Sequence, residues 1–199
     1  MTDIQVILVD EHDNPIGTME KHAAHHQGLR HRAISVYLFN GAGELLLQRR
    51  ALGKYHCGGL WSNSCCGHPY PDESAQHAAE RRLREEMGVQ VSLHKLFEFS
   101  YRLELANGMT EHEYGHLFGA IDDQTPHPDP AEADDFRYIA LADLETEMAA
   151  HPERFTPWFR LCYPSFRQYL HDHGGLAVLS AHQGPQFVER PRNSSRRPL

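Results

Sequence analysis

The sequence predicts an α+β domain in which helices flank a mixed or antiparallel β-sheet. Short apolar or alternating runs, separated by turn residues, predict strands at 4–9, 33–40, 44–50, 96–105, 109–121 and 136–141. Amphipathic stripes predict helices at 72–88, 142–150 and 158–171. Strands and helices that follow one another without a regular βαβ alternation are typical of the α+β class.

The predicted strands form two hairpins with a helix between them. Gly41-Ala42-Gly43 joins 33–40 to 44–50, and Asn107-Gly108 joins 96–105 to 109–121. The helix is capped by Asp72 and ends at Gly88. Residues 51–71 show no periodicity, and a long loop inside a compact domain is usually functional.

The length of 199 residues fits one domain with a tail. We place the domain at residues 1–173, ending after the predicted helix 158–171. Residues 174–199 contain proline, serine and arginine with few apolar residues, so we expect a mobile C-terminal tail.

Charge and composition exclude several classes of partner. A net charge of −8 disfavours nonspecific nucleic-acid binding, which needs a broad basic surface. There is no apolar run of 18 residues, and the N-terminus lacks the basic-then-apolar order of a secretory signal. We expect a cytoplasmic protein without a nucleic-acid or membrane partner. A monomer is favoured.

Two of the four cysteines, Cys65 and Cys66, are neighbours. A disulfide between adjacent residues would require a strained ring, and no C-x-x-C pair is present, so a redox pair is disfavoured. Sixteen histidines is a high count for this length, which makes a metal site worth seeking.

The loop and the helix after it carry a specific pattern. Gly67, Glu73 and the run from Arg81 to Gly88 have the spacing of the Nudix box, so the chain resembles the Nudix superfamily and a Nudix-like fold is implied. One position departs from the box. Arg82 stands where the box has a metal-binding glutamate, and this replacement would weaken a site for diphosphate hydrolysis.

Further motifs resemble one Nudix family, the type I isopentenyl-diphosphate isomerases. They extend from about residue 4 to 171, and their agreement in order is more specific than any single pattern. The matching stretches are Trp-x-Asn-Ser-x-Cys-Gly-His-Pro at 61–69, Lys21-x-x-x-His25, residues 29–35, residues 49–52, Tyr101-Arg102, residues 111–113 and Pro157-Trp158.

This resemblance implies that isopentenyl diphosphate is isomerised to dimethylallyl diphosphate, in isoprenoid biosynthesis, by transposing a C=C bond through a carbocation. The family's two proton-transfer groups map to Cys66 and Glu113, with Tyr101 as a relay. Cys66 can act as a base, because a thiolate is favoured near metal ions and basic side chains. Which of the two groups protonates first is open.

The resemblance also implies a divalent metal site of three histidines and two glutamates, which map to His25, His31, His68, Glu111 and Glu113. On a strand the two glutamates share a face about 6.6 Å apart. Nitrogen and oxygen ligands suit Mn²⁺, Zn²⁺ or Mg²⁺. His26, next to His25, is an alternative ligand.

For the diphosphate, the family implies a set of cations and an accompanying Mg²⁺ held partly by Glu86. Arg82 becomes a phosphate ligand in this interpretation, and Trp158 either faces the carbocation or packs the last helix, or does both. The cations are Lys21, Arg50, Lys54 and Arg82.

Three other functions compete with the isomerase. A Nudix-type diphosphate hydrolase shares the box but is disfavoured by Arg82, and a non-catalytic metal module would leave Cys66 and Glu113 unused. His112-Glu113-x-x-His116 matches the zinc-protease motif, which requires a helix. On the strand predicted here the two histidines lie roughly 13 Å apart, too far to share an ion.

Overall fold

A mixed β-sheet forms the middle layer of the molecule in the computed structural model, which describes residues 4–180. Within these residues the sheet has nine strands. They are β1 (Gln5–Val9), β2 (Pro15–Glu20), β3 (His31–Phe39), β4 (Leu45–Arg50), β5 (Trp61–Ser62), β6 (Cys65–Gly67), β7 (His94–Glu104), β8 (Thr110–Ile121) and β9 (Ala133–Ile139).

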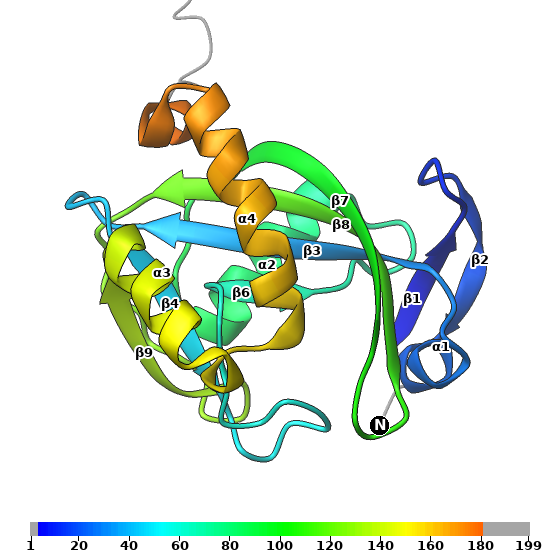
Figure 1. Ribbon diagram of the computed structural model, residues 1–199. Helices are drawn as coiled ribbons and strands as arrows, with labels where there is room; N and C mark the ends of the chain where they lie inside the picture. Colours follow the sequence, from blue (N-terminus) through cyan, green and yellow to red (C-terminus); the bar gives the residue numbers. More distant parts are fainter. Residues whose placement is uncertain (1–3, 181–199) are drawn as a thin grey trace, which may run out of the picture.

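Helices cover both faces of this sheet (Figure 1). The α-helices are α1 (Lys21–Gln27), α2 (Ala75–Met87), α3 (Leu141–Ala150) and α4 (Pro157–Asp172), and the 3₁₀ turns are η1 (Pro152–Arg154) and η2 (Gly175–Leu179). None of the helices within residues 4–180 is long and apolar enough to cross a bilayer.

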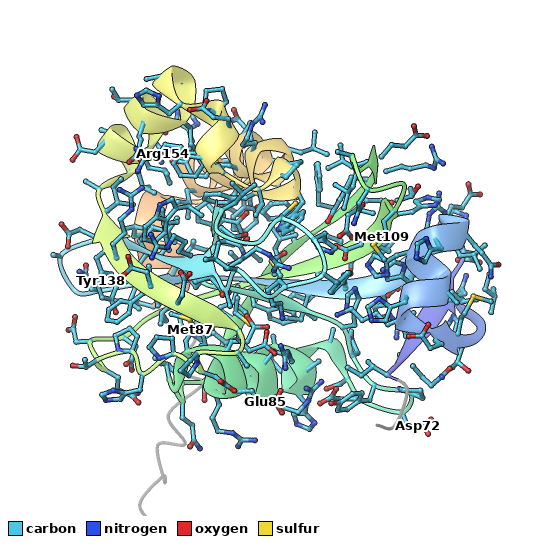
Figure 2. All side chains as sticks on the ribbon, turned by 90° about the horizontal axis from the view of Figure 1, so that it is seen from below. Asp72, Glu85, Met87, Met109, Tyr138 and Arg154 are labelled. Carbon is cyan, nitrogen blue, oxygen red and sulfur yellow. The ribbon has the colours of Figure 1, made fainter. Side chains whose placement is uncertain are left out.

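Alternation along the strands builds two separate cores. Tyr37 and Phe39 of β3 pack with apolar residues of α3 and α4, whereas Val36 and Leu38 pack with the stripe of α2. Figure 2 shows the resulting layers, with α2 and Glu85 on one side of the sheet and the segment around Arg154 on the other. The predicted α+β class with a mixed sheet is confirmed.

The second predicted hairpin is confirmed, and the first is wrong in its pairing. β7 and β8 pair antiparallel along their length. β3 and β4 share only the pair Phe39–Leu45, because β3 pairs in parallel with β8 and β4 pairs antiparallel with β9. The sequence predicted the turn between β3 and β4. It did not predict that β8 and β9 are the main partners of these two strands.

The sequence missed β2 and α1, which together bring the N-terminal segment to the start of β8. The Glu20 carboxylate caps α1 by accepting hydrogen bonds from the backbone N–H of His22 and Ala23. Gly28 ends the helix at φ +63°, where a Cβ atom would also approach Thr110 to 3.3 Å. In Figure 2 the labelled Met109 marks this meeting of β8 with α1.

Two predicted boundaries differ from those observed. Ser74, rather than Asp72, caps α2, since its hydroxyl accepts from the N–H of His77. The packed domain also continues past the expected end at residue 173, because η2 follows and Leu179 is buried in the core. Residues 181–199 of the predicted tail lie outside the described part of the chain.

Candidate active site

Three of the candidate side chains lie in one row across the sheet. Glu113 of β8 stands opposite His31 of β3 in the parallel pairing and opposite Tyr101 of β7 in the antiparallel pairing. Opposite residues share a face of the sheet. The Tyr101 hydroxyl donates to Glu113 Oε2 at 2.6 Å, and His31 Nε2 lies 3.9 Å from Glu113 Oε1. Strand register therefore places Glu113 between two of its partners.

Two further histidines surround this row. His25 comes from α1, and its Nε2 lies 3.4 Å from Oε2 of Glu111, two residues before Glu113 on β8. His68 follows β6, and its Nε2 lies 3.2 Å from Glu113 Oε1. Possible ligand atoms of His25, His31, His68 and Glu113 all lie within 4.8 Å of one another. Residues from distant segments thus form one buried cluster.

The donor set of this cluster fits a divalent metal ion. His25 Nδ1–H donates to the Lys21 carbonyl at 2.7 Å and His31 Nδ1–H to the Leu29 carbonyl at 2.8 Å, so each Nε2 presents a lone pair. Among residues 4–180, these Nε2 atoms and Oε2 of Glu111 are buried without a hydrogen-bond partner. Such atoms are costly unless satisfied, and an ion would satisfy all three.

Burial and neighbouring charges set the protonation of the cluster. Burial, together with the charge of Glu111, raises the pKa of Glu113 to about 7. Burial also lowers the pKa of His31 to about 4, so the imidazole is neutral, as a ligand must be. Burial alone would raise the pKa of Glu111, but the close approach of His25 and His56 lowers it well below its usual value. Glu111 therefore stays ionised at neutral pH.

The adjacent cysteines face opposite sides of the sheet. Cys65 is fully buried in the core under α2, whereas Cys66 packs toward the other core and reaches the cavity. The Cys66 sulfur lies 3.2 Å from Oδ1 of Asn63 and 3.5 Å from Oγ of Ser35. Burial raises the pKa of Cys66 to about 12. Without a bound metal ion, this environment favours a neutral thiol.

A single cavity of about 410 Å³ joins the cluster to a cationic region. His25 and His31 lie behind its wall and are fully buried. The other candidate residues from the sequence line it: Cys66, His68, Tyr101, Glu111, Glu113, Lys21, Arg50, Lys54, Arg82, Glu86 and Trp158. The structure thus brings together every site residue expected from the sequence.

Arg82 is held in this cavity by three carboxylates. Its guanidinium lies 2.7 Å from Glu85, 2.5 Å from Glu86 and 3.2 Å from Glu132. Its side chain crosses Gly67, where an added Cβ would lie only 3.0 Å from Arg82 Cγ. Gly67 at the end of β6 and Arg82 of α2 are therefore sterically linked.

Trp158 packs in the core and also reaches the cavity. Its ring is 5% exposed and belongs to the core between the sheet and α4, and it also lines the cavity. The Arg50 guanidinium carbon lies 5.1 Å from the centroid of this ring, within cation–π range. The indole therefore already contacts one cation at the edge of the cavity.

The geometry disfavours two alternative interpretations, His26 as the metal ligand and a zinc-protease site. His26 is exposed on α1, so His25 is the histidine that joins the cluster. His112 and His116 lie on a strand, as expected, and contact different groups: the Gly28 carbonyl and the Asp13 carboxylate. The zinc-protease geometry is therefore excluded.

Two residues of the site were not found from the sequence. His56 lies in the long loop, and its Nε2 is 3.0 Å from Oε1 of Glu111. Glu132 comes from the loop before β9 and contacts Lys54 and Arg82. For His56 the only available signal was the long aperiodic loop predicted at residues 51–71, which predicts function without naming a residue.

Comparison with known proteins shows the family to which the chain is similar. A NUDIX domain model matches residues 29–159. The chain is 51% identical to isopentenyl-diphosphate Delta-isomerase 2 of Aromatoleum aromaticum, covering 79% of this chain and 84% of that protein. It is 48% identical to the isopentenyl-diphosphate Delta-isomerase of Pectobacterium atrosepticum, covering 83% and 92% of the two chains.

Solved structures with lower sequence identity share the fold. A crystal structure of DR0079 from Deinococcus radiodurans superposes with a TM-score of 0.62 at 23% identity, covering 73% of this chain and 89% of that one. The MutT protein of Methanosarcina mazei Go1 gives 0.58 at 18% identity, covering 72% and 95%. With the Nudix fold shared and about half of the sequence identical to these isomerases, the chain belongs to the isopentenyl-diphosphate Delta-isomerase family of NUDIX-domain proteins.

Proposed function

We propose that the protein converts isopentenyl diphosphate to dimethylallyl diphosphate, with Cys66 and Glu113 as the proton-transfer groups. One observation carries the proposal. A thiol and a carboxyl group that can exchange protons line the same cavity as a cluster of cations. The names of the similar proteins indicate the substrate, isopentenyl diphosphate. The cavity offers proton-transfer groups for its alkene end and cations for its diphosphate end.

The reaction needs one proton added and one removed. One group protonates the terminal alkene carbon, which leaves a tertiary carbocation, and the other removes a proton from the neighbouring methylene group. Cys66 Sγ holds a proton in the free site, and Glu113, with a pKa near neutrality, can hold or release one. Tyr101 donates to Glu113 Oε2 and stabilises its ionised form.

The histidine–glutamate cluster would hold the metal ion of this site. His25, His31, His68, Glu111 and Glu113 are its proposed ligands, and Mn²⁺, Zn²⁺ or Mg²⁺ suits their atoms. A bound divalent ion supplies positive charge that makes an attached carboxylic acid a stronger proton donor. The buried side chains then keep Glu113 oriented and exclude water around it.

The cationic region is the proposed diphosphate site. Lys21, Arg50, Lys54 and Arg82 line it. Glu86 is 4% exposed and accepts a hydrogen bond from the Gln48 amide at 2.9 Å, so its carboxylate is held in place for the Mg²⁺ that accompanies the diphosphate. Trp158 would present its ring to the carbocation, where a cation–π contact contributes about 2 kcal/mol when desolvated.

The assay that tests this function incubates the protein with isopentenyl diphosphate and Mg²⁺ and measures the acid-labile allylic product. A parallel assay measures phosphate release from nucleoside diphosphate derivatives. Formation of the allylic diphosphate without phosphate release supports the isomerase. Hydrolysis without isomerisation would establish the Nudix-hydrolase alternative, and metal binding without turnover of either substrate would establish a binding module.

Arg82→Glu is expected to raise KM for isopentenyl diphosphate by roughly 10- to 100-fold, because a charge-assisted bond of about 1.5–3 kcal/mol is lost and repulsion replaces it. Steady-state kinetics at saturating Mg²⁺ measure the effect. Arg84→Glu is the matched control, since Arg84 is exposed on the same helix and outside the cavity. An unchanged KM for Arg82→Glu would remove Arg82 from the diphosphate site.

Alkaline pH is expected to weaken substrate capture through Lys21. Burial and the nearby cations of Lys54, Arg82 and Arg50 lower the pKa of Lys21 to about 8. The protonated amine binds the diphosphate, so kcat/KM falls as pH rises through about 8 in the free enzyme. Lys21→Arg keeps its charge and should lack this fall. Lys95→Arg, an exposed substitution, should retain it, and identical profiles for all three proteins would refute the assignment.

A further inference from the structure

We propose that His56 is a sixth ligand of the metal ion, in addition to the five residues that the family pattern supplies. The inference rests on the proposed function, because it takes the histidine–glutamate cluster to be a metal centre. It concerns a residue that enters the site from the loop between β4 and β5. His56 would give the centre a fourth imidazole.

His56 is fixed in position by aromatic side chains. Its side chain is 6% exposed. The Tyr55 ring lies 4.2 Å away and the Trp158 ring 5.2 Å away, between centroids, and both meet the imidazole edge-on. Tyr55 also packs against His25 with centroids 6.2 Å apart. The loop therefore anchors the imidazole beside α1 instead of leaving it at the surface.

Glu111 lies between His25 and His56. Its Oε2 is 3.4 Å from His25 Nε2, and its Oε1 is 3.0 Å from His56 Nε2. In residues 4–180, neither of these nitrogens has a partner in hydrogen-bonding geometry, although all three side chains are buried. Close approach of lone-pair atoms without hydrogen bonds is the arrangement expected of ligands that share an ion.

The spacings agree with a six-coordinate ion. With bonds of about 2.1 Å, neighbouring ligands of an octahedral ion lie roughly 3.0 Å apart and opposite ligands roughly 4.2 Å apart. Among the described residues, the histidine–glutamate distances in the site are 3.0 Å for His56–Glu111, 3.2 Å for His68–Glu113, 3.4 Å for His25–Glu111 and 3.9 Å for His31–Glu113. The His56 contact therefore falls among the spacings of the proposed ligands.

A single ion accounts for both groups of ligands. Ligand atoms of His25, His56 and Glu111 lie within 4.8 Å of one another, and His25 also belongs to the group with His31, His68 and Glu113. The Nδ1 atom of His25 is used by the Lys21 carbonyl, which leaves only Nε2 for coordination. Because one nitrogen lone pair binds one ion, an ion at His25 Nε2 would be shared by both groups, and the two groups would draw together around it.

A ligand at His56 fills the coordination sphere with protein atoms. With each carboxylate bound through one oxygen, four imidazoles and two carboxylates would make six donors, and no coordination position would remain for an exchangeable water. The ion would then make its carboxylate ligands more acidic and add positive charge to the cavity, without presenting a bound water to the substrate. The number of inner-sphere waters is therefore a direct measure of the proposal.

The experiment compares Mn²⁺ binding by the whole chain and by His56→Ala and His56→Asn. Chelator competition gives Kd, and water-proton relaxation of bound Mn²⁺ reports inner-sphere water. Both variants should raise Kd by roughly 100-fold or more, beyond the 10- to 100-fold typical of a residue that only orients a ligand. Both should also gain one exchangeable water. Asparagine can still donate to Glu111 but is a poor metal ligand, so it separates coordination from positioning.

His26→Ala is the matched control, since this exposed histidine lies next to a ligand and should change neither Kd nor relaxation. Thermal unfolding of the metal-free variants checks that they fold. A His56→Asn protein with the Kd and relaxation of the parent would overturn the role of His56 while leaving the isomerase intact. A parent protein that isomerises its substrate without binding Mn²⁺, Zn²⁺ or Mg²⁺ in the cluster would overturn the metal centre itself.

Discussion

Cys66→Ala is expected to lower kcat/KM for isopentenyl diphosphate by about 10³-fold or more. The substitution removes the Sγ proton, and a positioned proton-transfer group contributes roughly 10²–10⁴-fold. The change in shape is small, because the neighbouring Asn63 and Ser35 side chains remain. Turnover measured at saturating substrate would show the loss mainly in kcat, because the cationic end of the cavity is untouched.

The adjacent cysteine provides the control for this loss. Cys65→Ala removes a fully buried sulfur from the core under α2, on the opposite side of the sheet. It should lower stability by about 1 kcal/mol through a small cavity and leave most of the activity. Near-normal turnover in Cys66→Ala, or a greater loss in Cys65→Ala, would contradict the assignment of the thiol.

Glu113→Gln is expected to reduce kcat by at least about 10³-fold, because an amide keeps the shape of the carboxyl group but cannot exchange its proton at neutral pH. The hydrogen bond from Tyr101 should survive at the amide oxygen, so the sheet need not rearrange. Loss of charge also weakens a metal ligand, and the metal content of the variant must be measured alongside its rate.

Glu98→Gln is the corresponding control. Glu98 lies on β7, the strand that pairs with β8, and it contacts Tyr114 and Lys95 at the surface. Its substitution should leave kcat within about twofold, as is usual for surface positions. If Glu113→Gln retains full activity with its metal bound, Glu113 is not a proton-transfer group.

Local patterns predicted a large part of this fold. α2 could be found because its apolar stripe and the glycine at its end are both short-range signals, and β7–β8 because an Asn-Gly turn joins two alternating runs. The pairing of β3 with β8 could not be found. Both strands are suited to several neighbours, and only burial on two faces selects the parallel partner.

The site likewise contains residues that the sequence predicted and residues that it did not. The strand spacing of Glu111 and Glu113 and the Nudix spacing around Arg82 were visible along the chain, and the expected ligands do meet in space. His56 and Glu132 lie in loops whose conformation depends on distant contacts, so no periodicity marked them. The protonation of Cys66 also depended on burial, which the order of residues does not state.

The row of His31, Glu113 and Tyr101 has a consequence for how the protein acquires activity. His31 joins Glu113 and Tyr101 only after β3 has paired with β8 across the long stretch of chain between them, and loop-closure entropy makes such non-local pairing slow. During refolding, α2 and the β7–β8 hairpin can form early without producing a working site. Regain of turnover should therefore follow the final closure of the central sheet, and would time that step more selectively than helix content.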